Sequence, residues 1–187
     1  MVNINEQAPE FEEDAFADGE IKKIKLEDYR GKWLVLFFYP ADFTFVCPTE
    51  LESLADNYER FKELGAEIIS ISTDTAYVHK AWHDSSHSIS KIKFPMLSDP
   101  SHRVCCAYGT LIEEKGVSLR ATFIINPEGN IKSFEFHNND IGRSIDETIR
   151  KLQAAKFVAE NKGNVCPMNW KPGMKTIKPN IDLIGKI

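Results

Sequence analysis

The 187-residue sequence predicts an α/β fold in which helices flank a mixed central β-sheet and a C-terminal tail follows. Three observations support this fold class. The run Trp33 to Tyr39 is apolar at every position, which suits a strand covered on both faces. Leu51 to Leu64 carries apolar residues at helical spacing, and the strand pattern Glu67 to Ser72 follows it. Strand, helix and strand in this order are typical of a sheet with helices on its faces.

The region before the apolar run predicts a hairpin and a helical turn. Two strand patterns, Phe11 to Phe16 and Ile21 to Ile24, lie on either side of Asp18-Gly19. This dipeptide is typical of the tight turn of a β-hairpin. Leu26 to Tyr29 is short and is soon followed by Gly31, so we expect a single helical turn there.

Shorter elements are predicted in the middle of the chain. Thr73 to Thr75 offers side chains that can cap a helix running from about Ala76 to His83. Phe94 to Leu97 suits a short strand. A short helix is expected to open at Ser98 to Ser101 and to end at Tyr108.

The last third predicts a second hairpin and a long helix. Arg120 to Asn126 and Asn130 to Phe136 are strand patterns joined by a turn that contains proline and glycine. Ser144 and Glu147 have the spacing of a capping box, and the helix that follows is expected to reach about Asn161.

The order β, α, β, α, β, β, α matches a thioredoxin-like sheet. We expect one domain over residues 1–162 and an extended tail over residues 163–187, which has three prolines and little periodicity. Two small domains are the alternative organisation.

Composition excludes several classes of protein. A formal net charge of −5 disfavours a nucleic-acid partner, because proteins that bind nucleic acids usually present a basic surface. No segment is apolar over the length that a membrane span needs, and the polar N-terminus lacks the apolar stretch of a signal peptide. The sequence therefore predicts a cytoplasmic protein with no membrane partner.

The four cysteines, Cys47, Cys105, Cys106 and Cys166, do not suggest a structural framework. Structural disulfides are rare in the cytoplasm, and this spacing fits no common zinc site. We therefore expect no metal and no cofactor. A transient redox pair is compatible with a reducing compartment.

Cys47 stands at the junction between the apolar run and the first helix. If Thr44 caps this helix, Cys47 occupies its third position, where the partial positive charge of the helix start stabilises a thiolate. Pro48 is tolerated in a first turn. From these residues alone, a reactive cysteine and a buried inert one are both open.

The segment Pro40 to Glu50 resembles the active-site signature of the peroxiredoxins, Pro-x-x-x-Thr-x-x-Cys. Lys80 to His83, Arg120 to Phe123 and Val165 to Pro167 resemble the same family in order and spacing. The resemblance covers essentially the whole chain. It is to the typical two-cysteine members, and the ending Asp182 to Ile187 is similar to that of bacterial alkyl hydroperoxide reductases.

The resemblance implies a role for each residue of the signature. Cys47 is the peroxidatic cysteine, whose thiolate attacks a peroxide oxygen and becomes sulfenic acid. Thr44 binds the peroxide, and Pro40 shields the pocket. Arg120 supplies positive charge, and Glu50 orients an arginine. Without the resemblance, Arg120 would be interpreted as a surface residue of a strand.

Cys166 fits the resolving cysteine of the family. The resemblance implies that its thiol condenses with the Cys47 sulfenic acid of a partner subunit and forms an intersubunit disulfide. The alternative is a tail cysteine without function. The implied activity is a thiol-dependent peroxidase, acting on hydrogen peroxide and organic hydroperoxides.

The resemblance also implies partners. The disulfide would be recycled by a flavoprotein disulfide reductase or by a thioredoxin-type donor. The expected assembly is a homodimer and a ring of five dimers. A thioredoxin-like reductase is disfavoured because it needs Cys-x-x-Cys at the helix start, where this chain has Glu50 three residues after the cysteine. A chaperone assembled as a ring stays open.

Two weaker patterns carry alternatives. His79 and His83 have the spacing of two metal ligands on a helix, but a solvated helix face is favoured because no third ligand is indicated nearby. The adjacent pair Cys105 and Cys106 is unusual for the family. Two packing thiols are favoured over a further redox centre, because a vicinal disulfide is strained.

Overall fold

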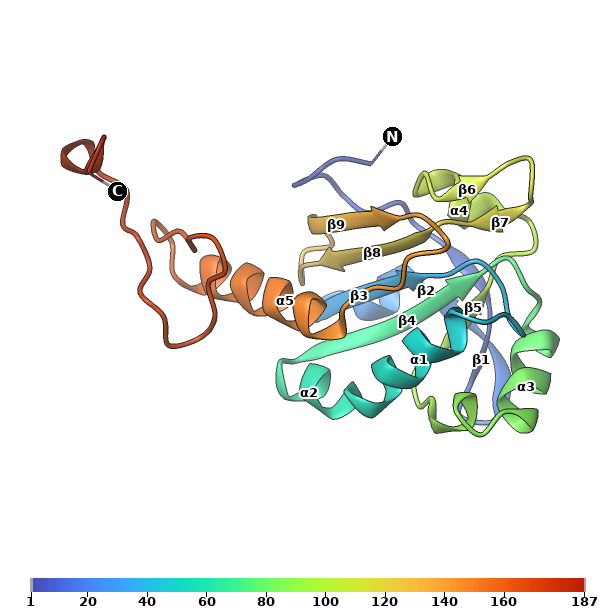
Figure 1. Ribbon diagram of the computed structural model, residues 1–187. Helices are drawn as coiled ribbons and strands as arrows, with labels where there is room; N and C mark the ends of the chain where they lie inside the picture. The colour runs from blue at the N-terminus through green and yellow to red at the C-terminus, as the bar shows by residue number, and fades with distance from the viewer. Residues whose placement is uncertain (1, 187) are drawn as a thin grey trace. The chain divides into compact units, whose positions relative to one another are not determined.

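The computed structural model describes residues 2–186 and divides the chain into two compact units (Figure 1). The first unit ends at Ile145, and the second begins at Asp146. The first unit is built on a seven-stranded mixed sheet of order β2-β1-β5-β4-β3-β8-β9. Its strands are β1 (Glu12–Ala17), β2 (Glu20–Lys25), β3 (Trp33–Phe38), β4 (Ala66–Ser72), β5 (Met96–Ser98), β8 (Arg120–Ile125) and β9 (Ile131–His137).

The central strand β3 is buried at all six positions, which explains its uninterrupted apolar sequence. It runs parallel to β4 on one side and antiparallel to β8 on the other. The order β4-β3-β8-β9, with a helix between β3 and β4, is that of the thioredoxin-like sheet. The predicted α/β class with a mixed sheet is therefore confirmed.

The predicted N-terminal hairpin is also confirmed. Asp18 and Gly19 both have positive φ, 54° and 82°, as the tight turn between β1 and β2 requires. The sequence did not indicate where this hairpin attaches. β1 pairs antiparallel with β5, with Ala15 opposite Leu97, so the hairpin extends the sheet.

The helices of the first unit depart from prediction in length. They are η1 (Leu26–Tyr29), α1 (Cys47–Asp56), α2 (Tyr58–Glu63), α3 (Ala76–Ser85), η2 (Ile89–Lys91) and α4 (Arg103–Ala107). The single helix predicted up to Leu64 is wrong, because Asn57 interrupts it with a ψ of 6°. The Asn57 side chain donates a hydrogen bond to the Ser53 carbonyl, and such local bonds compete with the helix.

Three further differences concern helix ends, helix starts and short strands. Thr75 caps α3 as predicted, since its side chain accepts from the Val78 amide, but α3 extends beyond His83 to Ser85. α4 starts only at Arg103, because His102 has a left-handed backbone with φ of 62°. The small hairpin of β6 (Leu111–Ile112) and β7 (Val117–Ser118) was not predicted, since two-residue strands show no alternation.

The core of the first unit lies between the central strands and the elements packed on them. Its largest buried side chains include Phe38, Phe123 and Tyr108, whose rings lie 5.1 to 5.6 Å apart in pairs. Over residues 2–186, the helices are too short or too polar for any of them to cross a membrane.

The second unit consists of α5 (Ile145–Glu160) and the segment after it. Gly163, three residues after the end of α5, has φ of 85°, a left-handed backbone that glycine adopts readily. The tail is more ordered than expected. Val165 and Ile177 form an antiparallel bridge, the Trp170 ring lies 4.8 Å from that of Phe157, and η3 (Ile181–Leu183) follows. The boundary expected after residue 162 stays a prediction.

Candidate active site

Cys47 is the first residue of α1 and is fully buried. The prediction that Thr44 caps the helix and that Cys47 holds its third position is wrong. Val46 precedes the helix without a side-chain cap, and the Thr44 hydroxyl instead donates to the Ala41 carbonyl at 2.9 Å. Cys47 still lies in the first turn, where the helix dipole and the N–H groups that lack helical partners stabilise a thiolate.

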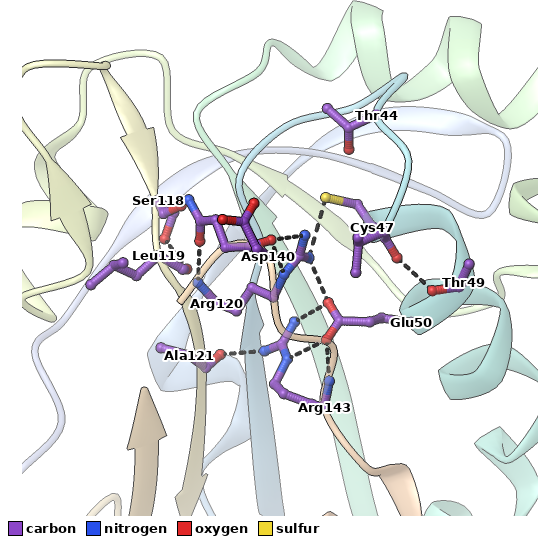
Figure 2. Close-up of polar contacts among 12 residues, drawn as sticks. Thr44, Cys47, Thr49, Glu50, Ser118, Leu119, Arg120, Ala121, Asp140 and Arg143 are labelled. Carbon is purple, nitrogen blue, oxygen red and sulfur yellow. Dashed lines mark hydrogen bonds and ion pairs between the residues drawn. The ribbon is translucent and has the colours of Figure 1, made fainter. Parts of the chain in front are cut away.

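Arg120 lies next to the sulfur of Cys47. Its Nη1 atom is 3.4 Å from Cys47 Sγ, and a dashed line marks this contact in Figure 2. Arg120 begins β8, the neighbour of β3, so the sheet brings it to the start of α1, which follows β3. Only 2% of Arg120 is exposed, which excludes the alternative of a surface arginine.

Glu50 lies one turn after Cys47 on α1 and accepts hydrogen bonds from two arginines. Its Oε2 atom is 2.8 Å from Arg120 Nη1 and 2.8 Å from Arg143 Nη2. Its Oε1 atom accepts from the backbone N–H of Arg143 at 2.7 Å and from Nε at 2.9 Å. Glu50 is 4% exposed, so this carboxylate and both guanidinium groups form a buried cluster.

Arg143 was missed by the sequence analysis. It lies in the loop between β9 and α5, outside every motif, and its guanidinium donates to the Ala121 carbonyl at 2.8 Å. Its Cζ atom stands 3.4 Å from the centre of the Phe37 ring, a cation–π arrangement. A lone arginine in a loop gives no periodicity or spacing from which this position could have been predicted.

The Glu50 carboxyl of this cluster is ionised. Burial raises the pKa of the Glu50 carboxyl, but the hydrogen bonds and charge of Arg143, together with the charge of Arg120, outweigh burial and lower it. Glu50 is therefore ionised, and two guanidinium groups face one carboxylate. The Arg120 guanidinium, which shares Glu50 with Arg143, also lies 3.4 Å from the Cys47 sulfur.

Asn139 holds the guanidinium of Arg120 in place. Its backbone carbonyl accepts from Arg120 Nε at 3.0 Å and from Nη2 at 2.8 Å. Its side-chain Oδ1 accepts from the Arg120 backbone N–H at 3.1 Å, and its Nδ2 donates to the Ser118 carbonyl at 3.2 Å. Asn139 was not predicted from the sequence, and it belongs to the same loop as Arg143.

The predicted residues of the β3–α1 loop lie beside this cluster. Pro40, two residues after the end of β3, is buried, and Thr44 is partly buried. Figure 2 shows the Thr44 hydroxyl pointing toward the side on which the Cys47 sulfur lies. Phe43, between them, has a left-handed backbone with φ of 54°, which is uncommon for a residue other than glycine.

Cys166, the predicted resolving cysteine, belongs to the second unit. It is partly exposed, and its Sγ atom lies 4.0 Å from the Ala154 carbonyl. Burial raises the pKa of its thiol, against the opposing effect of the positive charge of Arg150. Cys166 is therefore a protonated thiol at neutral pH.

The neighbouring cysteines on α4 differ from each other. Cys105 is fully buried, and burial together with the charge of Asp99 raises the pKa of its thiol to about 12. Cys106 is exposed. The prediction of two packing thiols is therefore confirmed for Cys105 and wrong for Cys106.

The prediction that His79 lies on a solvated helix face is wrong. His79 is fully buried, with Nδ1 2.7 Å from Asp42 Oδ2 and Nε2 3.2 Å from the Leu97 carbonyl. His83 is partly exposed, and its ring lies 5.0 Å from that of Phe16. Among the described residues, no three His, Cys, Asp or Glu side chains are grouped so that they could hold a metal ion.

Comparisons with known proteins identify the family. The AhpC/TSA family model matches residues 4–134, and the C-terminal domain of 1-Cys peroxiredoxin matches residues 154–183. Alkyl hydroperoxide reductase C of Pseudomonas aeruginosa is 48% identical over the full length of both chains.

Two solved structures resemble the fold closely. AhpC of Enterococcus faecalis is 49% identical, with a TM-score of 0.86 over 89% of this chain and 100% of the other. The reduced 2-Cys peroxiredoxin of Plasmodium vivax is 35% identical, with a TM-score of 0.91 over 96% of this chain and 94% of the other. The chain therefore belongs to the AhpC/TSA family of peroxiredoxins.

Proposed function

We propose that this protein is a thiol-dependent peroxidase that reduces hydrogen peroxide and organic hydroperoxides, with Cys47 as the peroxidatic cysteine. One observation carries the proposal. The Cys47 sulfur lies at a helix start, 3.4 Å from a guanidinium nitrogen, inside a buried cluster with surplus positive charge. The name of the relatives, alkyl hydroperoxide reductase C, supports a hydroperoxide as substrate.

In the first step the Cys47 thiolate attacks the terminal oxygen of a hydroperoxide. The O–O bond breaks, the sulfur becomes sulfenic acid, and the second oxygen leaves as an alkoxide or hydroxide that takes up a proton. Arg120 then stabilises the negative charge as it moves from the sulfur to the leaving oxygen. Because the Asn139 carbonyl holds the Arg120 guanidinium in place, the guanidinium needs to move little in order to stabilise the developing negative charge.

Thr44, Pro40 and Glu50 have supporting roles in the proposal. The Thr44 hydroxyl gives its hydrogen to the Ala41 carbonyl, so its oxygen is free to accept a hydrogen bond from the peroxide O–H. Pro40 contributes no N–H group and keeps water from the sulfenic acid. Glu50 orients Arg120 rather than acting as a base, since Arg120 and Arg143 already occupy its oxygens.

In the second step the Cys166 thiol condenses with the Cys47 sulfenic acid, giving a disulfide and water. We propose that the two cysteines belong to different subunits. The matched C-terminal model is named for one-cysteine peroxiredoxins, whereas this chain carries Cys166 within the matched segment. A flavoprotein disulfide reductase or a thioredoxin-type donor in the cytoplasm would then reduce the disulfide.

A homodimer that assembles into a ring of five dimers is part of the proposal. Two features of the first unit support association. β9 lies at an edge of the sheet, where its backbone groups can pair with another strand. Phe43 and Phe45 in the loop before α1 are 59% and 93% exposed, and Tyr77 on α3 is 76% exposed. Exposed large apolar side chains are typical of surfaces that bind another protein.

The test combines peroxide consumption with mass spectrometry. With dithiothreitol as reductant, the wild type should consume hydrogen peroxide and cumene hydroperoxide, and Cys47→Ser should not. After one equivalent of peroxide without reductant, non-reducing mass spectrometry should find a Cys47–Cys166 peptide from two chains. A Cys47→Ser variant with unchanged peroxide consumption would refute the assignment of Cys47. A disulfide that lacks Cys166 would refute the assignment of the resolving cysteine.

A further inference from the structure

The β3–α1 loop, residues 39–46, carries the peroxide-binding Thr44 to the start of α1, yet it has no regular secondary structure. A buried polar cluster holds it. The Asp42 side chain is fully buried, with Oδ2 2.7 Å from His79 Nδ1. The Tyr39 hydroxyl donates to the other carboxylate oxygen of Asp42 at 2.7 Å. His79 belongs to α3, which is green in Figure 1.

The hydrogen bonds of His79 determine how many hydrogens the pair holds. The Leu97 carbonyl, 3.2 Å from Nε2, can only accept, so Nε2 carries a hydrogen. Nδ1 and Asp42 Oδ2, at 2.7 Å, share a second hydrogen. The pair is therefore neutral as a whole, whichever partner holds the shared hydrogen. Removing one partner would leave a buried polar group without its main contact, which is strongly unfavourable.

Other contacts reach the loop from the same side. The Asp42 backbone N–H donates to Asp74 Oδ2 at 2.9 Å, and Asp74 lies in the turn that leads into α3. Trp82, one turn after His79, places its ring 5.8 Å from that of Phe43 and 6.4 Å from that of Tyr39. α3 and its leading turn thus hold both the backbone and the side chains of the loop.

The loop itself stores strain that opposes this closed form. Phe43 has φ of 54°, a left-handed backbone that is unfavourable for a residue with a Cβ atom. Its side chain is 59% exposed, so burial does little to compensate. A loop without the contacts from α3 would therefore relax away from this conformation.

We propose that Asp42 and His79 form a latch that sets the balance between a closed and an open β3–α1 loop. With the latch formed, Thr44 and Cys47 are positioned for peroxide. With it broken, the loop opens and Cys47 leaves its buried position, so that its sulfenic acid becomes accessible to the Cys166 thiol. The proposal rests on the proposed function, in which the two cysteines react in turn. Asp42 and His79 are positioning residues, and breaking their contact should affect the two chemical steps in opposite directions.

Three variants separate the latch from general stability. His79→Phe keeps a ring of similar size but leaves the Asp42 carboxyl without its partner. Asp42→Asn is the conservative variant, because its amide can donate to Nδ1 of a neutral His79 and still accept from Tyr39. His83→Phe is the matched control, one turn along α3, since His83 contacts Phe16 rather than the loop.

The first measurement is amide hydrogen exchange of the reduced protein, followed over residues 41–46. We expect His79→Phe to exchange at least about tenfold faster there, with exchange in β3 and β4 unchanged. Stopped-flow kinetics should then show a second-order rate constant with hydrogen peroxide at least about tenfold lower, and a disulfide-forming step as fast as in the wild type or faster. Asp42→Asn and His83→Phe should stay within about threefold of the wild type in all three quantities.

The latch would be overturned if the amides of residues 41–46 exchanged at the same rate in His79→Phe as in the wild type. It would also be overturned if His79→Phe slowed both chemical steps by the same factor. If His79→Phe does not fold, Tyr39→Phe takes its place, because it removes one hydrogen bond to Asp42. It should raise the exchange rate of the amides of residues 41–46 by about threefold. An unchanged exchange rate would overturn the latch. Exchange is measured without turnover, so it tests the latch even if Cys47→Ser refutes the proposed function.

Discussion

One nitrogen of Arg120, Nη1, lies 3.4 Å from the sulfur of Cys47, although 73 positions separate the two residues. The same atom donates to Glu50 Oε2 at 2.8 Å. The sulfur and the carboxylate therefore share one donor group. Arg143 donates three hydrogen bonds to the Glu50 carboxylate. The more fully these bonds satisfy Glu50, the more of the Arg120 charge acts on the Cys47 sulfur.

The first prediction concerns Arg120 itself. Arg120→Met should lower the second-order rate constant with hydrogen peroxide by roughly 10²- to 10³-fold, the usual cost of losing one donor to a developing charge. The rate constant of Arg120→Lys should lie between those of Arg120→Met and the wild type, because an ammonium keeps the charge but not the two fixed bonds to the Asn139 carbonyl. Stopped-flow kinetics measures both variants. Equal rates for Lys and Met would contradict a role for the charge.

The second prediction concerns Arg143, which touches Glu50 but not the sulfur. Arg143→Met should lower the free energy of unfolding by roughly 3–5 kcal/mol, because it leaves a buried carboxylate with one partner fewer. It should also lower the second-order rate constant with hydrogen peroxide, because Arg120 is then more fully neutralised by Glu50. Urea unfolding and stopped-flow kinetics measure the two effects.

The control for this prediction is Arg103→Met. The Arg103 side chain is 75% exposed and pairs with Glu13 at the surface. Its loss should change the free energy of unfolding by no more than about 0.5 kcal/mol. If both variants lose stability equally, the buried cluster is not the cause.

The central strand and the reactive residues could be predicted from the sequence, whereas the residue at which α1 begins could not. A strand that is apolar at every position needs both of its faces covered, which only the interior of a sheet provides. β3 is indeed buried at every position. Cys47, Glu50 and Arg120 were nominated because the signature around them is specific. The structure brings these three together, since β8 pairs with β3 beside the start of α1.

Residues that act through backbone groups or through lone contacts could not be predicted. Asn139 holds Arg120 mainly with its carbonyl, a group that every residue has. His79 was assigned to a solvated helix face because no third metal ligand is indicated near His79 and His83 in the sequence. Its burial depends on Asp42, 37 positions away, and no local pattern links the two.

The third prediction concerns pH. The folded state lowers the pKa of Glu50 below its unfolded value of about 4.3, so ionised Glu50 contributes stability above that value and the contribution is lost as pH falls through the lowered pKa. The difference in free energy of unfolding between wild type and Glu50→Gln should be constant from about pH 8 to about pH 6 and shrink below about pH 4. Urea unfolding across this range measures it.

The exposed variant Glu63→Gln is the control for the pH series. Its free energy of unfolding should stay within about 0.5 kcal/mol of the wild type. A difference for Glu50→Gln that stays constant down to about pH 3 would show that the carboxylate charge does not contribute.

The fourth prediction concerns the turn between β8 and β9. A Cβ atom at Gly129 would lie 1.5 Å from Arg30 Nη1, and Gly129 has φ of 82°. Gly129→Ala should displace Arg30 from the Glu128 carbonyl and from Glu10, in addition to straining the backbone. Gly19→Ala is the matched control, since Gly19 also has φ of 82° and a Cβ there would meet nothing within 4 Å. Urea unfolding should show that Gly129→Ala lowers the free energy of unfolding by roughly 1–2 kcal/mol more than the control does. Equal losses in the two variants would contradict the role of Arg30.

The last prediction separates the two neighbouring cysteines of α4. Cys105 is fully buried, its thiol pKa is raised to about 12, and its backbone N–H donates to Asp99 Oδ2 at 2.7 Å. Alkylation needs both access and a thiolate, so iodoacetamide at about pH 8 should label Cys106 readily and leave Cys105 unlabelled in the folded protein. In about 6 M guanidinium chloride both should be labelled, which shows that the peptide is detectable. Mass spectrometry of the α4 peptide decides the outcome. If Cys105 were labelled at the same rate as Cys106 in the folded protein, this part of the core would have to open. If a Cys105–Cys106 disulfide formed after treatment with peroxide, the pair would be a second redox centre.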